Sequence, residues 1–211
     1  METRTLAVRT HGRYLVRTPG VAPPWPLLVG FHGYRENAAM HMAVLESIAG
    51  NEGWLLVAVQ GLHRFYTKGG DVVASWMTKE DRELAIADNV AYVGQVLDAV
   101  RAEFPTRGEP AFVGFSQGVA MAFRAAAHFP ASALIVAGAD VPPDVIAGTV
   151  VPLPPVLYGR GSRDDLYTAE HHARDIGALE RLGAKVRAVT YDGGHELAPG
   201  FLEAAATVLR R

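Results

Sequence analysis

The chain of 211 residues has the length of one globular domain, and its 49% hydrophobic and 20% charged residues are ordinary for a folded protein. A formal net charge of -2 gives no electrostatic reason to expect a nucleic acid or an anionic membrane surface as a partner. The absence of cysteine excludes disulfides, thiolate metal sites and a cysteine nucleophile.

The predicted strands are short apolar runs bounded by glycine or proline. The first twenty residues contain no apolar run long enough for a signal peptide, so a cytoplasmic location is expected. In the same region, the segments ETRTLAVRT and RYLVRTP predict an antiparallel hairpin at a sheet edge. Nothing later in the chain approaches a membrane span. Strands buried on both faces are expected at 27–31, 54–59, 111–115, 133–137 and 155–158, with a final strand at 185–191.

Helices are predicted between these strands. Apolar residues spaced three and four apart from 86 to 104, stopped by Pro105, predict a long amphipathic helix. Another helix ends at 49, with Asn37 as its N-cap and Gly50 as its C-terminal stop. The remaining predicted helices are at 117–129, 168–183 and 199–210. The longest irregular stretch is expected at 61–79.

The alternation of strands and helices predicts one α/β domain over 1–211, with a mostly parallel twisted sheet, helices on both faces and an antiparallel N-terminal edge. In such sheets, ligands bind at the carboxyl ends of the strands. The residues just after each apolar run are therefore the candidates for a functional site.

Ser116 lies in the motif G-x-S-x-G at 114–118, between a predicted strand and a predicted helix. In this context the motif forms a sharp elbow, and the two glycines avoid a clash with the neighbouring strand and helix. The pattern therefore indicates a nucleophile exposed at the carboxyl edge of the sheet. The alternative is an inert serine in a tight packing turn.

A serine hydroxyl needs a base to take its proton, and His195 follows the last predicted strand in the loop GGHE. The base in turn needs a carboxylate that holds its tautomer. Asp164, after the strand at 155–158, is the best-placed candidate, with Asp165 and Asp140 as alternatives. The chain order serine, aspartate, histidine is the one associated with the α/β-hydrolase topology.

Two backbone N–H groups are expected to bind the oxyanion of a tetrahedral intermediate. Gln117 follows the serine at a helix N-terminus, where the helix dipole also favours negative charge. Tyr34 lies in FHGYREN after the strand at 27–31, and its amide is the second expected donor. His32 and Gly33 are expected to shape this turn.

Taken together, HGYREN, GFSQG, GSRD and GGHE, in this order and spacing, resemble the phospholipase/carboxylesterase family of small α/β-hydrolases, which includes acyl-protein thioesterases and bacterial carboxylesterases. The resemblance covers about residues 27–209. It implies an α/β-hydrolase fold without a lid domain, and a serine hydrolase without a cofactor. It also implies Ser116, Asp164 and His195 as catalytic residues and the amides of Tyr34 and Gln117 as the oxyanion hole.

Arg35 departs from the family pattern, because relatives often carry glycine at this position of H-G-x-G-E-N. A charged side chain beside the oxyanion loop is expected to affect the preferred substrate. Phe65, Trp76 and Met77 lie beyond a strand end and are further candidate substrate contacts, with burial in an ordinary apolar cluster as the alternative. The connection at 140–154 is too short for a helical cap, so open substrate access is expected.

The expected function is the hydrolysis of carboxylic esters or thioesters, with small or acyl substrates, through an acyl-enzyme. The alternatives are acyl transfer or peptide cleavage by the same residues, and a non-catalytic ligand-binding protein on the same scaffold. Because H-E-x-x-H and similar spacings do not occur, no metal is expected. The expected partner is a small-molecule ester or thioester, and a homodimer could form through an exposed sheet edge or an apolar helix.

Overall fold

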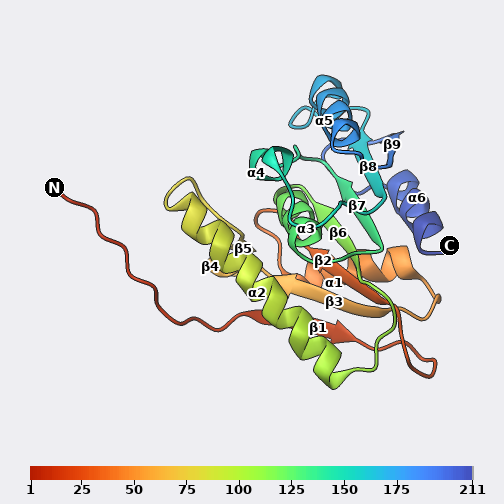
Figure 1. The fold of residues 1–211 in the computed structure, drawn as a ribbon, viewed down its shortest axis with the longest axis horizontal. Coiled ribbons are helices and arrows are strands. Elements are labelled where there is room, and N and C mark those ends of the chain that lie inside the picture. Colours follow the sequence, from red (N-terminus) through yellow and green to blue (C-terminus); the bar gives the residue numbers. More distant parts are fainter. Residues whose placement is uncertain (211) are drawn as a thin grey trace.

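The structure, a computed structural model, describes residues 1–210 and has a seven-stranded sheet at its centre. Residue 211 of the expected domain lies outside the described residues. Seven strands pair in the order β1-β3-β2-β6-β7-β8-β9 (Figure 1). Only β1 is antiparallel to its neighbour, β3, and all other neighbours in this sheet are parallel. The strands are β1 (Arg13–Arg17), β2 (Leu27–Phe31), β3 (Leu55–Gln60), β6 (Ala111–Phe115), β7 (Ala133–Ala137), β8 (Val156–Gly161) and β9 (Val186–Tyr191).

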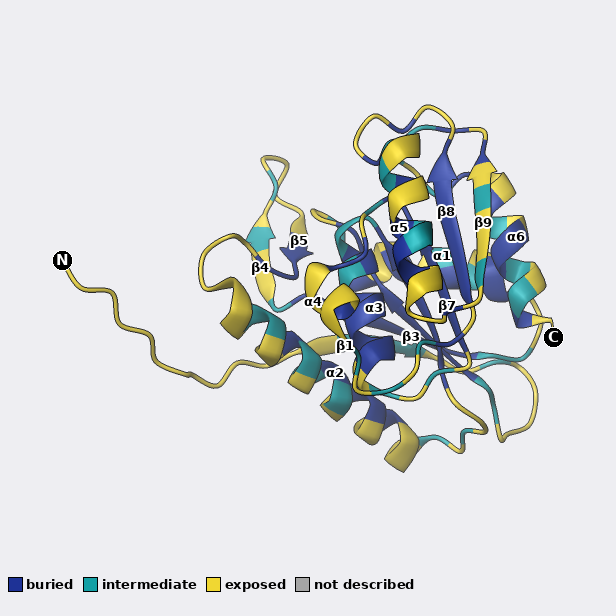
Figure 2. Cartoon of the chain, turned by 45° about the horizontal axis from the view of Figure 1, so that its top comes forward, coloured by how far each residue is buried: buried dark blue, intermediate teal, exposed yellow. Residues whose placement is uncertain are grey.

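Helices cover both faces of this sheet. An apolar cluster joins α1 (Ala38–Ala49) and α6 (Pro199–Leu209) to one face, and a second cluster joins α2 (Arg82–Glu103), α3 (Gln117–His128) and α5 (Ala169–Arg181) to the other. Every residue of β2, β6 and β7 is therefore buried, and Figure 2 shows the neighbouring strands β7 and β8 in dark blue. No helix within residues 1–210 combines the length and the apolarity that crossing a membrane requires.

The ends of the helices follow local sequence signals. The Asn37 side chain accepts a hydrogen bond from the Met40 amide at 2.9 Å, and α1 ends at Gly50, whose φ is 52°. Thr168 caps α5 in the same way, through the amide of His171. The predicted strands, helices and caps of the central layers are thus confirmed to within a few residues.

Two predictions for the periphery are wrong. Residues 1–12 form no strand and extend away from the sheet (Figure 1), because they are exposed and bury no apolar face, so β1 is an edge strand and not half of a hairpin. The stretch 61–79 is also not irregular, since β4 (His63–Tyr66) and β5 (Val72–Ser75) form an antiparallel hairpin. The turn between them uses Gly70, which has a φ of 88°.

An ion pair between a buried arginine and a partly exposed aspartate fixes the short helix α4 (Pro143–Ala147), which lies in the connection after β7. The Arg124 side chain on α3 is fully buried, and its Nε and Nη2 each donate to one carboxylate oxygen of Asp144 at 2.8 Å. These hydrogen bonds lower the pKa of Asp144 below its ordinary value. Helix α4 is thereby held against α3, the helix that begins just after Ser116.

We expect Asp144→Asn to lower the free energy of unfolding at neutral pH by about 1–2 kcal/mol, because it weakens a charge-assisted bidentate contact to a buried guanidinium. Since the folded-state pKa of Asp144 lies below its unfolded value, this contribution is present above about pH 4 and is lost as pH falls through the folded pKa. The difference between variant and wild type should therefore shrink towards pH 2 in urea unfolding. Glu109→Gln, which removes an exposed partner of Arg101, should change stability by less than about 0.5 kcal/mol.

Candidate active site

Ser116 occupies a strained elbow between β6 and α3. Its φ of 50° and ψ of -122° lie in a region that residues other than glycine rarely adopt, at a cost of about 1–3 kcal/mol. Its amide donates to the Ala137 carbonyl of the neighbouring strand at 3.0 Å, which fixes the turn. The elbow therefore projects the serine side chain beyond the carboxyl end of β6.

The two glycines of the motif are required by close backbone packing. A Cβ at position 118 would lie 2.0 Å from the Phe31 carbonyl oxygen, and a Cβ at position 114 would lie 2.6 Å from the Gly118 carbonyl oxygen. Neither distance is tolerable, so helix α3 can approach β2 and β6 only without these side chains. The spacing G-x-S-x-G thus follows from the geometry of the elbow.

Ser116, His195 and Asp164 form one chain of hydrogen bonds. His195 Nε2 lies 2.8 Å from Ser116 Oγ, and its Nδ1 lies 2.9 Å from Asp164 Oδ2. Because a carboxylate only accepts, Nδ1 carries the proton and Nε2 presents its lone pair to the hydroxyl. The arrangement can draw a proton from the serine.

Of the aspartates weighed from the sequence, the structure brings Asp164 to the histidine. Its side chain is fully buried, and its Oδ1 accepts from the amides of Leu166 and Tyr167, both at 2.9 Å. Asp140 instead accepts from Arg174 at 2.8 Å, and Asp165 is exposed. Asp164 is therefore held rigidly with one oxygen left for His195.

The loop after β2 is fixed by the buried ring of His32. Its Nε2 accepts from the Gly61 amide at 2.9 Å, and its Nδ1 lies 2.7 Å from the Gly33 carbonyl oxygen and donates to it. Burial lowers the pKa of His32, which keeps the ring neutral and Nε2 available as an acceptor. His32 shapes this turn, as its position in the sequence suggested.

The two amides expected to bind an oxyanion have no acceptor among residues 1–210. Gln117 is the first residue of α3, so its N–H has no carbonyl one turn earlier to receive it. Within residues 1–210, the Tyr34 N–H donates no hydrogen bond, although its neighbour Arg35 donates to the Ala74 carbonyl at 3.1 Å. The structure thus leaves both expected oxyanion donors unoccupied.

Side-chain hydrogen bonds tie these two donors to the end of β5. The Gln117 amide oxygen accepts from the Trp76 N–H at 2.9 Å, and its Nε2 donates to the Met77 carbonyl at 3.0 Å. Trp76 Nε1 in turn donates to the His32 carbonyl at 2.8 Å. The loop after β2, the end of β5 and the start of α3 are therefore one connected unit.

Glu36 belongs to this unit and was missed from the sequence. Its Oε2 accepts from the Gly33 amide at 2.7 Å, and its own carbonyl accepts from Ala74 at 2.8 Å. Burial raises the pKa of Glu36, while the Gly33 hydrogen bond and the nearby His195 partly oppose that rise. A carboxylate three residues after the glycine of HG was the available signal, because it can fold back onto that turn.

A cavity of about 400 Å³ opens at Ser116. Met77, an expected substrate contact, lies in its wall. Arg35 and Phe65 line a separate groove of about 450 Å³ beside Tyr34. The expectation that Trp76 contacts the substrate is wrong, because its side chain is fully buried against Phe31 and His32 and lines neither the cavity nor the groove.

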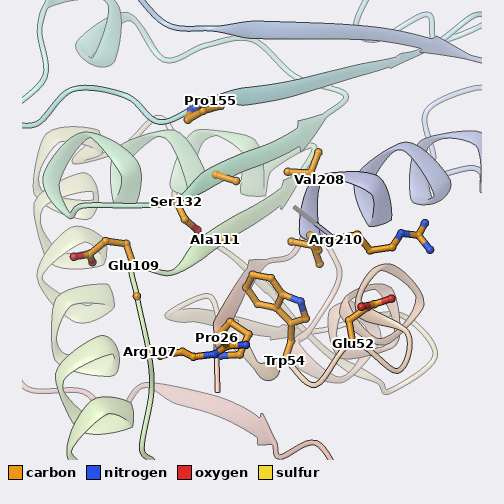
Figure 3. Close-up of a pocket in the computed structure, with 13 residues that line it drawn as sticks. Pro26, Glu52, Trp54, Arg107, Glu109, Ala111, Ser132, Pro155, Val208 and Arg210 are labelled. Carbon is orange, nitrogen blue, oxygen red and sulfur yellow. The ribbon is translucent and has the colours of Figure 1, made fainter. Parts of the chain in front are cut away.

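A larger cavity, of about 710 Å³, lies at the opposite end of the sheet (Figure 3). Pro26, Ala111 and Ala133 place it at the amino ends of the parallel strands, with Trp54 and Arg107 at its rim. None of the residues singled out from the sequence as site candidates lines it. The chemistry-bearing side chains gather at the carboxyl ends instead, as expected for a parallel sheet.

No model of a protein family matches the chain, and a search of curated proteins finds no match. Solved structures do match over nearly the whole chain. Esterase PE8 is 27% identical, with a TM-score of 0.72 and coverage of 94% of this chain and 97% of the esterase. The chain has the α/β-hydrolase fold.

Two further hydrolase-fold structures match equally well in shape. A Bacillus cereus carboxylesterase is 18% identical, with a TM-score of 0.74 and coverage of 94% of this chain and 93% of the other. Zea mays acyl-protein thioesterase 2 is 19% identical, with a TM-score of 0.72 and coverage of 95% and 98%. These neighbours are consistent with the phospholipase/carboxylesterase family that the motifs resemble.

Gly118→Ala should destabilise this hydrolase fold by about 3 kcal/mol, because the new methyl group forces α3 away from the Phe31 carbonyl. Gly177→Ala is the matched control, since a Cβ there meets nothing closer than 3.5 Å and alanine is the better helix former. Thermal unfolding should show opposite shifts for the two variants. Equal stability of Gly118→Ala and wild type would contradict the packing argument.

Proposed function

We propose that the protein is a serine hydrolase that cleaves carboxylic esters or thioesters through an acyl-enzyme. The observation that carries the proposal is the hydrogen-bond chain from Ser116 Oγ through His195 to Asp164, with distances of 2.8 and 2.9 Å. An esterase that is 27% identical over nearly the full length of both chains supports the same reaction class.

In the first half-reaction, Ser116 Oγ attacks the carbonyl carbon of the ester while His195 Nε2 takes the hydroxyl proton. The carbonyl oxygen becomes an oxyanion, which the amides of Tyr34 and Gln117 stabilise. The bond to the leaving group then breaks as the imidazolium returns the proton to the departing oxygen or sulfur. Asp164 stabilises the positive ring throughout.

In the second half-reaction, His195 takes a proton from a water molecule, which attacks the acyl-enzyme at the same carbonyl carbon. A second oxyanion forms between the same two amides, and collapse returns the proton to Ser116 Oγ. The products are the carboxylic acid and free enzyme. Because water is the only co-reactant and no atom changes its oxidation state, the proposed reaction requires no cofactor.

We expect Ser116→Ala to lower kcat for short-chain p-nitrophenyl esters by at least about 10⁴-fold, because the nucleophile is gone while the fold is retained. A fluorophosphonate should label wild-type protein at Ser116, and intact-mass analysis with peptide mapping locates the adduct. Ser132→Ala, at the distant cavity, provides the control and should leave both readouts unchanged. Folded wild type that neither reacts with the label nor hydrolyses any ester would end the proposal.

Glu36 is proposed as a positioning residue for the Tyr34 amide. Glu36→Ala should lower kcat about tenfold with little change in KM, because the oxyanion loop loses the hydrogen bond at Gly33. Glu36→Gln keeps an acceptor oxygen in place and should restore most of the loss. If the glutamine variant is as impaired as the alanine variant, the negative charge of Glu36, and not its hydrogen bond, is what matters.

A further inference from the structure

The cavity at Ser116 has an apolar wall and two cationic side chains. Its apolar part is formed by residues from the end of β5, from α3 and from the connection after β7. Lys79 and Arg82 border the same cavity and are exposed. The apolar residues are Met77, Ala120, Ala139, Val141, Pro142 and Pro143.

The balance of charge around this cavity is positive. Neither Lys79 nor Arg82 forms an ion pair within the part of the chain that the structure describes. The one carboxylate of the lining, Asp140, is already engaged by Arg174 at 2.8 Å, with His171 3.6 Å away. Asp144 is partly exposed and forms a bidentate bond to Arg124, and it also interacts electrostatically with Arg82 without a direct ion pair. Neither cation is therefore held in a direct ion pair with these carboxylates, and both can bind a further carboxylate.

The position of the cavity relative to Ser116 and His195 indicates which part of an ester would enter it. Ser116 lines the cavity, but His195 does not. Because His195 must protonate the leaving group, the leaving group lies on the histidine side, outside this cavity. The acyl group is then the part of the substrate that extends along Met77 towards Lys79 and Arg82.

We propose that the preferred substrates are esters or thioesters whose acyl group carries a terminal carboxylate, bound by Lys79 and Arg82. This inference rests on the proposed hydrolase function and adds the substrate class. The methylene chain of such an acyl group contacts the apolar wall, and its carboxylate meets the unpaired cations at the rim. Hydrolysis of the acyl-enzyme then releases a dicarboxylic acid, with water supplying one oxygen and the proton that returns to Ser116.

The test compares acyl groups of equal length with and without the terminal charge. Monomethyl succinate, glutarate and adipate are paired with methyl butanoate, pentanoate and hexanoate, and the acid released is quantified by chromatography. We expect wild type to show a kcat/KM at least about tenfold higher for one or more charged esters, with the advantage decreasing as salt is added. The double variant Lys79→Gln, Arg82→Gln should lose this advantage and keep its activity on the neutral esters.

Arg107→Gln removes one positive charge at the distant cavity of Figure 3 and should behave as wild type on both series. Equal activity of wild type on charged and neutral esters would overturn the inference, as would an equal loss on both series in the double variant. Calorimetric titration of Ser116→Ala with the same esters tests recognition without turnover. Binding of the charged esters in the absence of any wild-type hydrolysis would support the recognition site while rejecting the proposed function, and no selective binding would reject the site.

Discussion

The contact between the start of α3 and the end of β2 determines the geometry of the whole site. A Cβ at position 118 would lie 2.0 Å from the Phe31 carbonyl oxygen and 2.7 Å from that of His32, so the helix backbone rests directly on the strand end. The same helix start carries Ser116 and the Gln117 amide, and the same strand end leads into the loop with the Tyr34 amide. The packing of two backbone segments therefore fixes how Ser116 and the Gln117 amide lie relative to the loop that carries the Tyr34 amide, the groups to which the proposed mechanism assigns attack and oxyanion binding.

Polar interactions, most of them between neutral groups, then hold the loop after β2 in one arrangement. The ring of His32 is neutral because burial lowers its pKa, and a protonated ring could not accept the hydrogen bond from Gly61. The side chain of Gln117 and the indole N–H of Trp76 are neutral as well. Glu36 is the exception, and its carboxylate is directed to the Gly33 amide. Apart from Glu36, the side chains that hold this loop therefore carry no net charge.

The sequence was sufficient for the central sheet and for predicting that Ser116, Asp164 and His195 lie close together, because each residue stands in the loop after a predicted strand and parallel strands end at one edge of the sheet. It was not sufficient for the β4–β5 hairpin, since a four-residue strand with an exposed face gives almost no periodic signal. Because β5 was not predicted, the direction of the Trp76 side chain could not be predicted either. Trp76 lies one residue beyond β5, and its side chain is buried in the core and does not face the cavity. Glu36 acts through a fold-back contact to the Gly33 amide, and its spacing of three residues from that glycine indicates such a contact only once the turn at 33–36 is recognised.

The hairpin also supports the strained backbone at Arg35. Arg35 has a φ of 62°, where a side chain costs about 1 kcal/mol or more relative to glycine. The Arg35 N–H donates to the Ala74 carbonyl, and the Ala74 N–H donates to the Glu36 carbonyl. Strand β5 thus holds the turn in a conformation that glycine would adopt freely. The strain is therefore compensated by two backbone hydrogen bonds. The Arg35 side chain, in turn, lies with Lys68 in the groove beside Tyr34, outside the cavity at Ser116. The shape of the oxyanion loop and the charge beside it are thus set by different elements, so the charge can change without displacing the Tyr34 amide.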